Sequence, residues 1–512
     1  MAPAVFKTVV PFDDGGWVRL PFASAIFSFR GVVDQKDTRE VRHSDPRRML
    51  PSVSVVLECA LIAPLFDLYP RVLVLDAVRD ALQAYRDTLP TDSLPLSVDD
   101  VAERACELLE QSRRDDLRPV VNATGIILHT GLGRAVLPKT AVHALSGLDR
   151  CCNLQIDLDT GRRGKRNYAA EQLLCRLTGA ESAMVVNNNA AATLLVLTAL
   201  CAQREVIVSR GQLIEIGGSY RLPDCIHQSG AQLVEVGTTN KTHLHDYARA
   251  ITPDTSAVMR VNPSNYRIVG FSKEVSIREL VTLKKSADIL VIDDLGCGAL
   301  IDLSQYGLPK EPTVQESIEA GADIALFSGD KLIGGPQSGI IVGKEDLIRM
   351  IRKHPLTRML RVDKMTDMAL QETLRLFLEP ERLPSTHPTI AMLATPVREL
   401  RRLANSLMRR IVSMNSELGV SILDDESAVG GGSVPAESLP TCVVALTHPK
   451  MTANALSRAL RLSQPPVIGR ISDNAVLLDV RTLLPGDDVR VVEAIQQALV
   501  AISKMKEPLS GH

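Results

Sequence analysis

Residues 324–342 read Ile-Ala-Leu-Phe-Ser-Gly-Asp-Lys-Leu-Ile-Gly-Gly-Pro-Gln-Ser-Gly-Ile-Ile-Val. The apolar runs 324–327 and 339–342 are typical of buried strands, and the polar turn between them carries one lysine, Lys331. A lysine withdrawn from water in such a turn has a lowered pKa, and its neutral amine can form a Schiff base with an aldehyde cofactor. Taken alone, a Lys-x-x-Gly-Gly turn is more often a solvated surface turn.

Further apolar runs of the same kind lie upstream of this stretch and alternate with helical patterns. They cover residues 183–187, 205–209, 232–236, 257–261 and 289–293. Continuous apolar strands between helices indicate a mostly parallel sheet that is covered on both faces. Together with the two strands beside Lys331, these runs predict one large seven-stranded α/β domain.

The rest of the chain has a different character on each side of this domain. Helical periodicity over residues 53–65, 72–85 and 98–112 predicts a small helical domain near the N-terminus. A glycine-rich turn at 430–432 and apolar runs near 442–446 and 476–480 predict a second, smaller α/β domain. We therefore expect an unassigned extension, an N-terminal helical domain, a large catalytic domain and a small C-terminal domain, at residues 1–45, 46–118, 119–375 and 376–512.

Composition describes an ordinary globular protein rather than a nucleic-acid coat or a membrane protein. The 512 residues have a formal net charge of −2, 45% hydrophobic and 23% charged residues, and no apolar run of membrane-spanning length. The nine cysteines form no Cys-x-x-Cys pair and no zinc-like spacing, which fits a reducing compartment. We predict a cytoplasmic protein without a metal site or a membrane partner.

Two polar strand ends in the large domain are candidates for a cofactor site. Asn187, Asn188 and Asn189 follow one strand and open an alanine-rich helix, whose N-terminal N–H groups can bind a phosphate. Ordinary helix capping is the competing interpretation, although three asparagines exceed what a cap needs. Asp293 and Asp294 end another strand, where a carboxylate can keep a ring nitrogen protonated.

Only one of the two adjacent aspartates can face a ligand, because successive strand residues point to opposite faces. We favour Asp294 for this role, and the alternative is a loop aspartate that bonds its own backbone. The carboxyl ends of parallel strands meet at one edge of the sheet. A phosphate-binding turn, an acid at Asp294 and then Lys331 follow one another along the chain. This order predicts a cofactor that carries an aldehyde and a phosphate.

These motifs resemble those of the bacterial selenocysteine synthases, the L-seryl-tRNA(Sec) selenium transferases, over residues 46–485. The resemblance is carried by Asn122–Thr130, Leu132–Ala135, Leu177–Glu181, Val186–Ala192, Glu235–Asn240, Ser328–Gly335 and Pro466–Arg470. It implies an aspartate-aminotransferase-like (type I) fold that depends on pyridoxal 5'-phosphate, with Lys331 as the residue that binds the cofactor covalently. It also implies conversion of L-seryl-tRNA(Sec) to L-selenocysteinyl-tRNA(Sec) through a cofactor-bound aminoacrylyl intermediate.

The resemblance further implies the residues and partners of that reaction. Arg134, Arg358 and Arg361 are expected to bind the selenium donor, selenophosphate, since arginine holds oxyanions bidentately. If Arg358 and Arg361 lie on a helix, their spacing places them on one face. The N-terminal helical domain is expected to hold the tRNA. A homodecamer is implied, with subunit contacts at Thr238, Thr239, Asp246 and Tyr266.

Four sites depart from the family pattern, which usually has Asn, Glu, a His-Thr pair and Ser at these places. They are Gly131, Gln212, Asn262-Pro263 and Cys297. The departures concern substrate detail and leave the lysine, the acid and the arginines in place. The alternative function is a pyridoxal-phosphate-dependent lyase or dehydratase that acts on a small amino acid or amino-sugar acid without tRNA. A non-catalytic RNA-binding scaffold is disfavoured, because Lys331 and Asp294 are both present.

Overall fold

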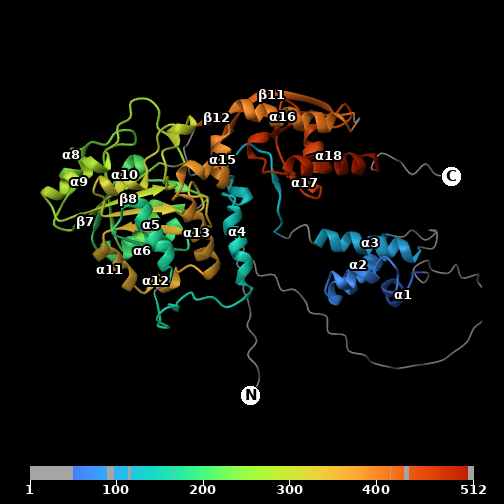
Figure 1. Ribbon diagram of the computed structural model, residues 1–512, viewed down its shortest axis with the longest axis horizontal. Helices are drawn as coiled ribbons and strands as arrows, with labels where there is room; N and C mark the ends of the chain where they lie inside the picture. Colours follow the sequence, from blue (N-terminus) through green and yellow to red (C-terminus); the bar gives the residue numbers. More distant parts are fainter. Residues whose placement is uncertain are drawn as a thin grey trace, which may run out of the picture. The chain divides into compact units, whose positions relative to one another are not determined.

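The computed structural model describes residues 50–88, 97–112, 117–164, 166–218, 220–263, 265–414, 417–431 and 437–504. The chain forms two compact units, Met1–Leu117 and Arg118–His512 (Figure 1). The extension expected at residues 1–45 lies outside the described residues.

The described part of the first unit is helical and has its own apolar core. Its elements are α1 (Val53–Leu57), the 3₁₀-helix η2 (Ala63–Asp67), α2 (Arg71–Thr88) and α3 (Val98–Ser112). Val56, Val78 and Val101 lie fully buried in the core that these helices share. The single helix expected over residues 53–65 is wrong, because Pro64 cannot donate a backbone hydrogen bond and starts the separate η2 turn instead.

The second unit is built on the predicted seven-stranded sheet, which is confirmed. The strands, in sheet order, are β2 (Ser182–Val186), β10 (Gly339–Gly343), β9 (Ile324–Ser328), β8 (Leu290–Gly296), β7 (Thr255–Val261), β3 (Glu205–Ser209) and β6 (Gln232–Val236). Only β10 runs antiparallel to its neighbours in this sheet, so the sheet is mostly parallel. The carboxyl ends of β2, β8 and β9 therefore lie along the same edge.

Helices cover both faces of this sheet, as Figure 1 shows. On one face the core includes residues of α6 (Asn189–Cys201), α7 (Leu222–Gln228) and α11 (Glu345–Lys353). On the other face it includes residues of α5 (Tyr168–Thr178), α8 (Leu244–Ala250), α9 (Ile277–Val281), α10 (Val314–Glu319) and α13 (Lys364–Leu376). This double coverage explains why the strands are continuous apolar runs in the sequence.

The C-terminal part of the second unit is a smaller α/β layer. Its antiparallel sheet has the order β11 (Gly419–Ala428), β12 (Ser438–Thr447), β15 (Ala475–Asp479) and β14 (Arg470–Ser472). The core of this layer takes residues from α16 (Val397–Val412), α17 (Ala453–Leu462) and α18 (Asp487–Lys504).

A segment from far upstream is built into this layer. We call residues 121–130 the strap. Its strand β1 (Val121–Asn122) pairs in parallel with β13 (Val467–Ile468), and the backbone N–H of Leu128 donates to the carbonyl of Val429 at 2.8 Å. The strap therefore links the C-terminal layer to the residues that follow it, among which the backbone N–H of Ala135 donates to the carbonyl of Asp330 at 3.4 Å.

The remaining described elements are short connections. They are α4 (Lys139–Leu145), α12 (Leu356–Met359), α14 (Leu383–Thr386), α15 (Pro388–Ala394), the β4–β5 hairpin (Glu215–Ile216 and Tyr220–Arg221) and the 3₁₀-helices η3 to η9. In the described part of the chain, no helix has the length and apolar character needed to cross a membrane. The same residues contain no group of three or more His, Cys, Asp or Glu that could hold a metal ion.

Candidate active site

A cavity of about 440 Å³ lies at the carboxyl ends of the parallel strands. Lys331, Asp294, Arg134, Asn188 and Asn189 all line it. Its volume is within the range of small-molecule sites, and its position is where ligands bind in open α/β sheets. The structure therefore brings five of the eight predicted site residues and their cationic, anionic and amide groups into one place.

The Lys331 side chain lines this cavity. Its residue is only 8% exposed, and burial lowers the pKa of the amine, with the Arg134 charge acting in the same direction. Cys297, Asp294 and Asp330 oppose that shift. Within the described residues, the Nζ atom has neither a hydrogen bond nor an ion pair, so the amine is available to a ligand.

The turn that carries Lys331 is held from behind by a buried histidine. The imidazole Nδ1 of His387 accepts from the N–H of Ile390, so Nε2 carries the proton and donates to the carbonyl of Ile333 at 2.8 Å. Gly334 has φ +69°, and a Cβ there would overlap the His387 ring. Burial lowers the pKa of His387 to about 4, which keeps the ring neutral.

Asp294 is held at the cavity by three hydrogen-bond donors. Its carboxylate accepts from Asn189 Nδ2 at 2.8 Å, Thr193 Oγ1 at 3.0 Å and the N–H of Gly296 at 3.1 Å. Burial raises the pKa of Asp294, while these hydrogen bonds and Lys331 oppose the rise. The geometry thus presents an oriented, buried carboxyl group near the lysine.

Asp293 points away from this cavity, as the alternation of strand residues requires. Its carboxylate pairs with Arg260 Nη1 at 3.2 Å and accepts from Ser317 Oγ at 2.7 Å. Asp293 does not line the cavity, so Asp294 is the acid that the structure places beside Lys331.

The three asparagines have three different positions. Asn188 caps α6 by accepting from the N–H of Ala191 at 2.9 Å, which is the ordinary capping role. Asn189 orients Asp294, and both residues line the cavity. Asn187 has an exposed side chain that does not line it, while its backbone N–H donates to the carbonyl of Leu360 at 2.9 Å.

Unpaired polar atoms mark this cavity as a site for a polar ligand. Arg134 forms a 2.8 Å ion pair with Asp330, but its buried Nε atom has no hydrogen-bond partner in the described part of the chain. The same holds for Asn265 Nδ2 and Asn189 Oδ1, which belong to two other residues of the lining. Two donors and one acceptor thus have no partner among the described protein groups, which fits a cofactor carrying a phosphate and a ring hydroxyl.

Arg358 and Arg361 line a different cavity of about 620 Å³, together with Arg166 and Arg352. They do not share a helix face, because α12 ends at Met359 and Arg361 forms an isolated bridge with Val186. The bridge connects the linings of the two cavities. Arg361 lines the second cavity, and its partner Val186 lies two residues before Asn188, which lines the Lys331 cavity. Arg352, which also lines this cavity, donates two hydrogen bonds to the Glu171 carboxylate, at 2.8 and 3.1 Å.

The four departures from the family pattern have defined surroundings. Gln212 is buried and accepts from the N–H of Val261 at 3.1 Å. Asn262 lines the Lys331 cavity and donates to Glu311 at 3.2 Å. Burial raises the pKa of the Cys297 thiol to about 12. A Cβ at Gly131 would lie 3.3 Å from the His129 ring, so a side chain there contacts that ring.

Three of the four residues expected at subunit contacts have hydrogen-bond partners within the chain. The Tyr266 hydroxyl donates to the carbonyl of Gly211, and Asp246 accepts from the N–H of His243 at 2.8 Å. Thr238 Oγ1 donates to the carbonyl of Lys241 at 3.0 Å. These contacts order the loops, and the subunit contacts stay a prediction.

Sequence reasoning missed several residues of the site, among them Thr193, His387, Asn265, Thr130 and Tyr220. Thr193 could have been found, because it follows Asn189 by four positions and so shares its helix face. Tyr220 lines the cavity, and burial raises its pKa. His387 and Asn265 reach the site only through the folding of distant segments, for which the sequence has no local signal.

Family models match most of the chain. The model described as L-seryl-tRNA selenium transferase matches residues 120–484, and the selenocysteine synthase N-terminal model matches residues 47–86. Two curated relatives are each named L-seryl-tRNA(Sec) selenium transferase and are each 47% identical to this chain. The protein from Moorella thermoacetica aligns over 88% of this chain and 97% of its own length, and that from Desulfomicrobium baculatum over 84% and 94%.

A solved structure shares the fold. The D-glucosaminate-6-phosphate ammonia-lyase is 19% identical, has a TM-score of 0.53, and matches 77% of this chain and 99% of its own. This likeness confirms the predicted fold class and carries no argument about substrate. The family model and the curated relatives together cover the whole large sheet and the Lys331 cavity. The chain therefore belongs to the L-seryl-tRNA selenium transferase family.

Proposed function

We propose that this protein converts L-seryl-tRNA(Sec) to L-selenocysteinyl-tRNA(Sec), with pyridoxal 5'-phosphate as its cofactor and selenophosphate as the selenium donor. The curated relatives that align with nearly their full length carry this activity in their names. The observation that carries the proposal is the buried, unpaired Lys331 amine in a cavity that also holds Asp294.

The chain offers a group for each part of the cofactor. The Lys331 amine would hold the aldehyde carbon, and Asp294 would accept from the ring nitrogen. The N-terminal end of α6 would receive the phosphate, because its first backbone N–H groups have no intrahelical partner. When bound, pyridoxal phosphate supplies an electron sink for a carbanion next to the amino group of the substrate.

The cavity residues would orient the acid and transfer a proton around that group. Asn189, Thr193 and the N–H of Gly296 hold the Asp294 carboxylate in a fixed orientation. Burial keeps a larger share of Lys331 neutral than an exposed lysine would have, so the amine can accept a proton from the α-carbon of the seryl group.

We propose Arg134, Arg358 and Arg361 as the ligands of selenophosphate. Arg134 lines the Lys331 cavity, and its Nε atom is unpaired among the described residues. Arg361 pairs with Val186 at the end of β2, just before the asparagines that open α6. This proximity along β2 supports a donor site in which the second cavity delivers the anion toward Lys331.

The remaining parts of the proposal concern partners. The helices of residues 46–118 would hold the tRNA, the large domain of residues 119–375 would carry the chemistry, and residues 376–512 would form the small domain. The protein would act in the cytoplasm, where charged tRNA is made. A homodecamer is proposed from the family resemblance, with Thr238, Thr239, Asp246 and Tyr266 at its contacts.

The decisive experiment is conversion of seryl-tRNA(Sec) with and without selenophosphate. Lys331→Ala should abolish conversion, because the amine that holds the aldehyde and accepts the proton is gone. The conservative Lys331→Arg variant keeps a positive charge and serves as the control for charge alone. Full activity of Lys331→Ala would refute the assignment of the lysine.

The same assay separates the alternative function. A lyase or dehydratase would release ammonia from free serine or an amino-sugar acid without tRNA. We expect no such release from the purified protein. Rapid, Lys331-dependent release from a small amino acid, with seryl-tRNA(Sec) left unchanged, would replace the proposed reaction by the alternative.

A further inference from the structure

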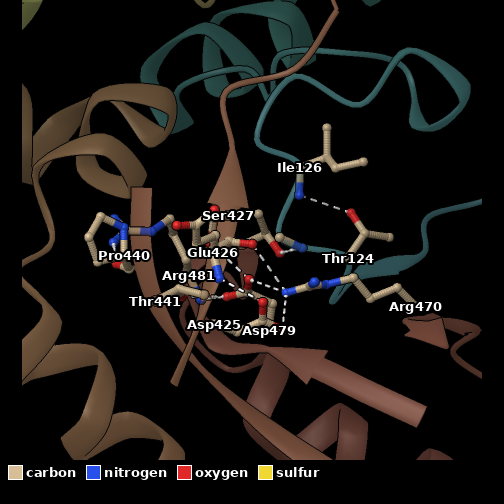
Figure 2. Close-up of polar contacts among 12 residues, drawn as sticks. Thr124, Ile126, Asp425, Glu426, Ser427, Pro440, Thr441, Arg470, Asp479 and Arg481 are labelled. Carbon is tan, nitrogen blue, oxygen red and sulfur yellow. Dashed lines mark hydrogen bonds and ion pairs between the residues drawn. The ribbon is translucent and has the colours of Figure 1, made fainter. Parts of the chain in front are cut away.

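A buried carboxylate lies at the point where the strap joins the C-terminal layer. Asp479, at the end of β15, is fully buried, and Figure 2 shows its polar contacts. Its Oδ1 accepts from Thr441 Oγ1 at 2.8 Å and from the N–H of Arg481 at 3.0 Å, and its Oδ2 accepts from Ser427 Oγ at 2.8 Å. Arg470 Nη2 completes the set at 3.5 Å. The carboxylate thus connects β11, β12, β14 and β15.

The two arginines extend this cluster to other segments. Arg481 donates to the carbonyls of Met392 at 2.7 Å and Pro440 at 2.6 Å, so it also holds the end of α15. Arg470 forms a 2.8 Å ion pair with Asp425. A buried charge with two cationic neighbours is expensive to disrupt, since removing one partner leaves the other uncompensated. The Asp479 cluster is therefore a rigid part of the fold.

The strap lies directly against this carboxylate. The backbone N–H of Asp479 donates to the carbonyl of Ala123 at 2.9 Å, and the N–H of Gly125 donates to Thr482 Oγ1 at 3.2 Å. Gly125 has φ +76°, and a Cβ at this position would overlap the Asp479 carboxylate. The strap can approach so closely only because residue 125 has no side chain.

From Gly125 the contact continues to the cavity wall. Its carbonyl accepts from the N–H of Ala428 at 2.9 Å, and the N–H of Ile127 donates back to the Ala428 carbonyl at 3.0 Å. Beyond these pairs, Thr130 at the end of the strap and Gly431 after β11 both line the Lys331 cavity. A Cβ at Gly431 would lie 3.6 Å from Thr130 Oγ1, so the two segments meet there.

The strap also carries Arg134 into the cavity. The backbone N–H of Arg134 donates to the carbonyl of His129 at 2.9 Å, which ties the arginine to the strap end. Its guanidinium binds Asp330, the neighbour of Lys331, at 2.8 Å. The position of the strap therefore sets the position of the one arginine that faces Lys331 in the described cavity.

We propose that Asp479 is a positioning residue for the Lys331 cavity: by holding the strap against the C-terminal sheet, it places Thr130 and Arg134 at the cavity wall. Asp479 does not line the cavity and touches no reacting group. The inference rests on the proposed function only in treating Lys331 as the reactive amine.

A pair of glycine substitutions tests this without removing the buried charge. Gly125 and Gly179 both have φ +76°, so alanine has to adopt a positive φ at each position. At Gly125 the added methyl group overlaps Asp479, whereas at Gly179, which caps the far end of α5, nothing lies within 4 Å. Only Gly125→Ala should displace the strap.

The first readout needs neither cofactor nor tRNA. Competitive labelling of the apoprotein with acetic anhydride, followed by mass spectrometry of the peptide that contains Lys331, reports the reactivity of that amine across pH. We expect Gly125→Ala to move the Lys331 labelling profile, because Arg134 and its partner Asp330 are displaced together. We expect Gly179→Ala to leave it at the wild-type profile.

The second readout is the kinetics of the seryl-tRNA reaction. A displacement of about 1 Å at a site can cost on the order of 10²-fold in rate, so we expect kcat/KM to fall at least about tenfold in Gly125→Ala. Much of the loss should appear as a raised KM for selenophosphate, because Arg134 is proposed to bind that anion. Gly179→Ala should stay within about twofold of the wild type in the same assay.

Asp479→Asn and Ser427→Ala give independent versions of the test. Asp479→Asn keeps the size of the side chain and loses its charge, while Ser427→Ala removes only the hydrogen bond from Ser427 Oγ to Oδ2. Both should shift Lys331 labelling in the same direction as Gly125→Ala, with Ser427→Ala the smaller effect. If Asp479→Asn does not fold, the two milder variants decide the question.

Wild-type labelling profiles in both Gly125→Ala and Ser427→Ala would overturn the proposal, as would equal losses in Gly125→Ala and Gly179→Ala. Failure of the proposed function has a different signature, since seryl-tRNA(Sec) would then go unconverted by the wild type while the labelling differences persisted.

Discussion

Lys331 and Asp294 are buried ionisable groups whose pKa values move in opposite directions. Burial lowers the pKa of the lysine amine and raises that of the carboxyl group, so each is moved toward its neutral form. Hydrogen bonds from Asn189 and Thr193 counter this for Asp294, whereas the Lys331 amine has no such donor or acceptor in the described part of the chain. The site therefore favours a reactive amine beside an oriented acid.

The amine should capture pyridoxal phosphate at a lower pH than an ordinary lysine. Capture requires the neutral form, and a lowered pKa makes that form abundant below the usual value of 10.5. The rate of borohydride-trapped labelling at position 331, measured against pH, should reach its half-maximum below 10.5. Nα-acetyl-lysine, which has only the side-chain amine, is the control when treated alike. A half-maximum at or above that of this ε-amine would contradict the burial argument.

His387 should contribute a pH dependence of stability. Its pKa is about 4 in the folded protein against 6.5 when unfolded, so the unfolded chain binds an extra proton between these values. Stability is complete above pH 6.5 and falls as the pH drops toward 4, by up to about 3 kcal/mol. Below pH 4 the loss from this residue no longer grows.

Urea unfolding at pH 7 and pH 4.5 measures this effect. His387→Asn keeps a capping acceptor for α15 but has no titrating ring, so the stability difference between the two pH values should shrink. An unchanged difference would show that His387 does not titrate as its burial requires.

The sequence predicts those site residues whose position can be recognised from the residues next to them in the chain. Lys331 and Asp294 follow apolar strands, and that position alone places them at the sheet edge where ligands bind. Thr193 and His387 carry comparable weight in the geometry but were missed. A hydrogen bond between segments far apart in the chain, such as His387 to Ile333, leaves no trace in either segment alone.

At the scale of elements, strands were predicted closely because they are buried on both faces. Each of the seven expected runs lies within two residues of an observed strand at its start, and helices alternate with them. Short helices were predicted less well. Pro64 divides the run at 53–65, and the chain leaves the helical conformation after Met359, so Arg361 pairs with β2 instead. The pairing of the strap strand β1 with β13 was not predicted from the sequence.

The start of α6 offers a test of element-level roles among three neighbouring asparagines. Asn188→Ala removes the helix cap and should cost about 1 kcal/mol of stability. Asn189→Ala leaves the cap but frees Asp294, so it should lower retention of pyridoxal phosphate more than stability. Asn187→Ala should have the least effect on either, because its side chain is exposed.

Thermal unfolding and cofactor retention during gel filtration, measured on the three variants side by side, separate these effects. Asn188→Asp, which preserves the capping acceptor, is the matched control for the helix. If Asn187→Ala released the cofactor most readily, the assignment of the three positions would be wrong.

At the scale of the whole molecule, the chain divides into two units with separate cores. Among the described residues, the core of the first unit contains only residues of that unit, and the Lys331 cavity is lined only by residues of the second. This separation was visible in the sequence as a change from helical periodicity to alternating strands and helices. Local sequence patterns do not predict how two such units are arranged relative to one another.

Removal of residues 1–117 should therefore leave the second unit folded. We expect the shortened protein to capture pyridoxal phosphate at position 331 with the wild-type rate, because every described residue of that cavity remains. Binding of seryl-tRNA(Sec), measured by filter retention, should fall at least about tenfold if the helical unit holds the tRNA. Undiminished tRNA binding would instead place the RNA contacts on the second unit.

The strap has a consequence for biosynthesis. Gly125 leaves the ribosome long before Asp479, and at ordinary elongation rates the interval is roughly 20 to 70 seconds. The large sheet can assemble only in the later part of that interval, after β10 has been made, and even then the strap lacks its hydrogen bonds to Asp479 and Thr482. A nascent chain therefore cannot complete its reactive pocket until translation is almost finished, which ties the appearance of activity to the arrival of the C-terminal strands.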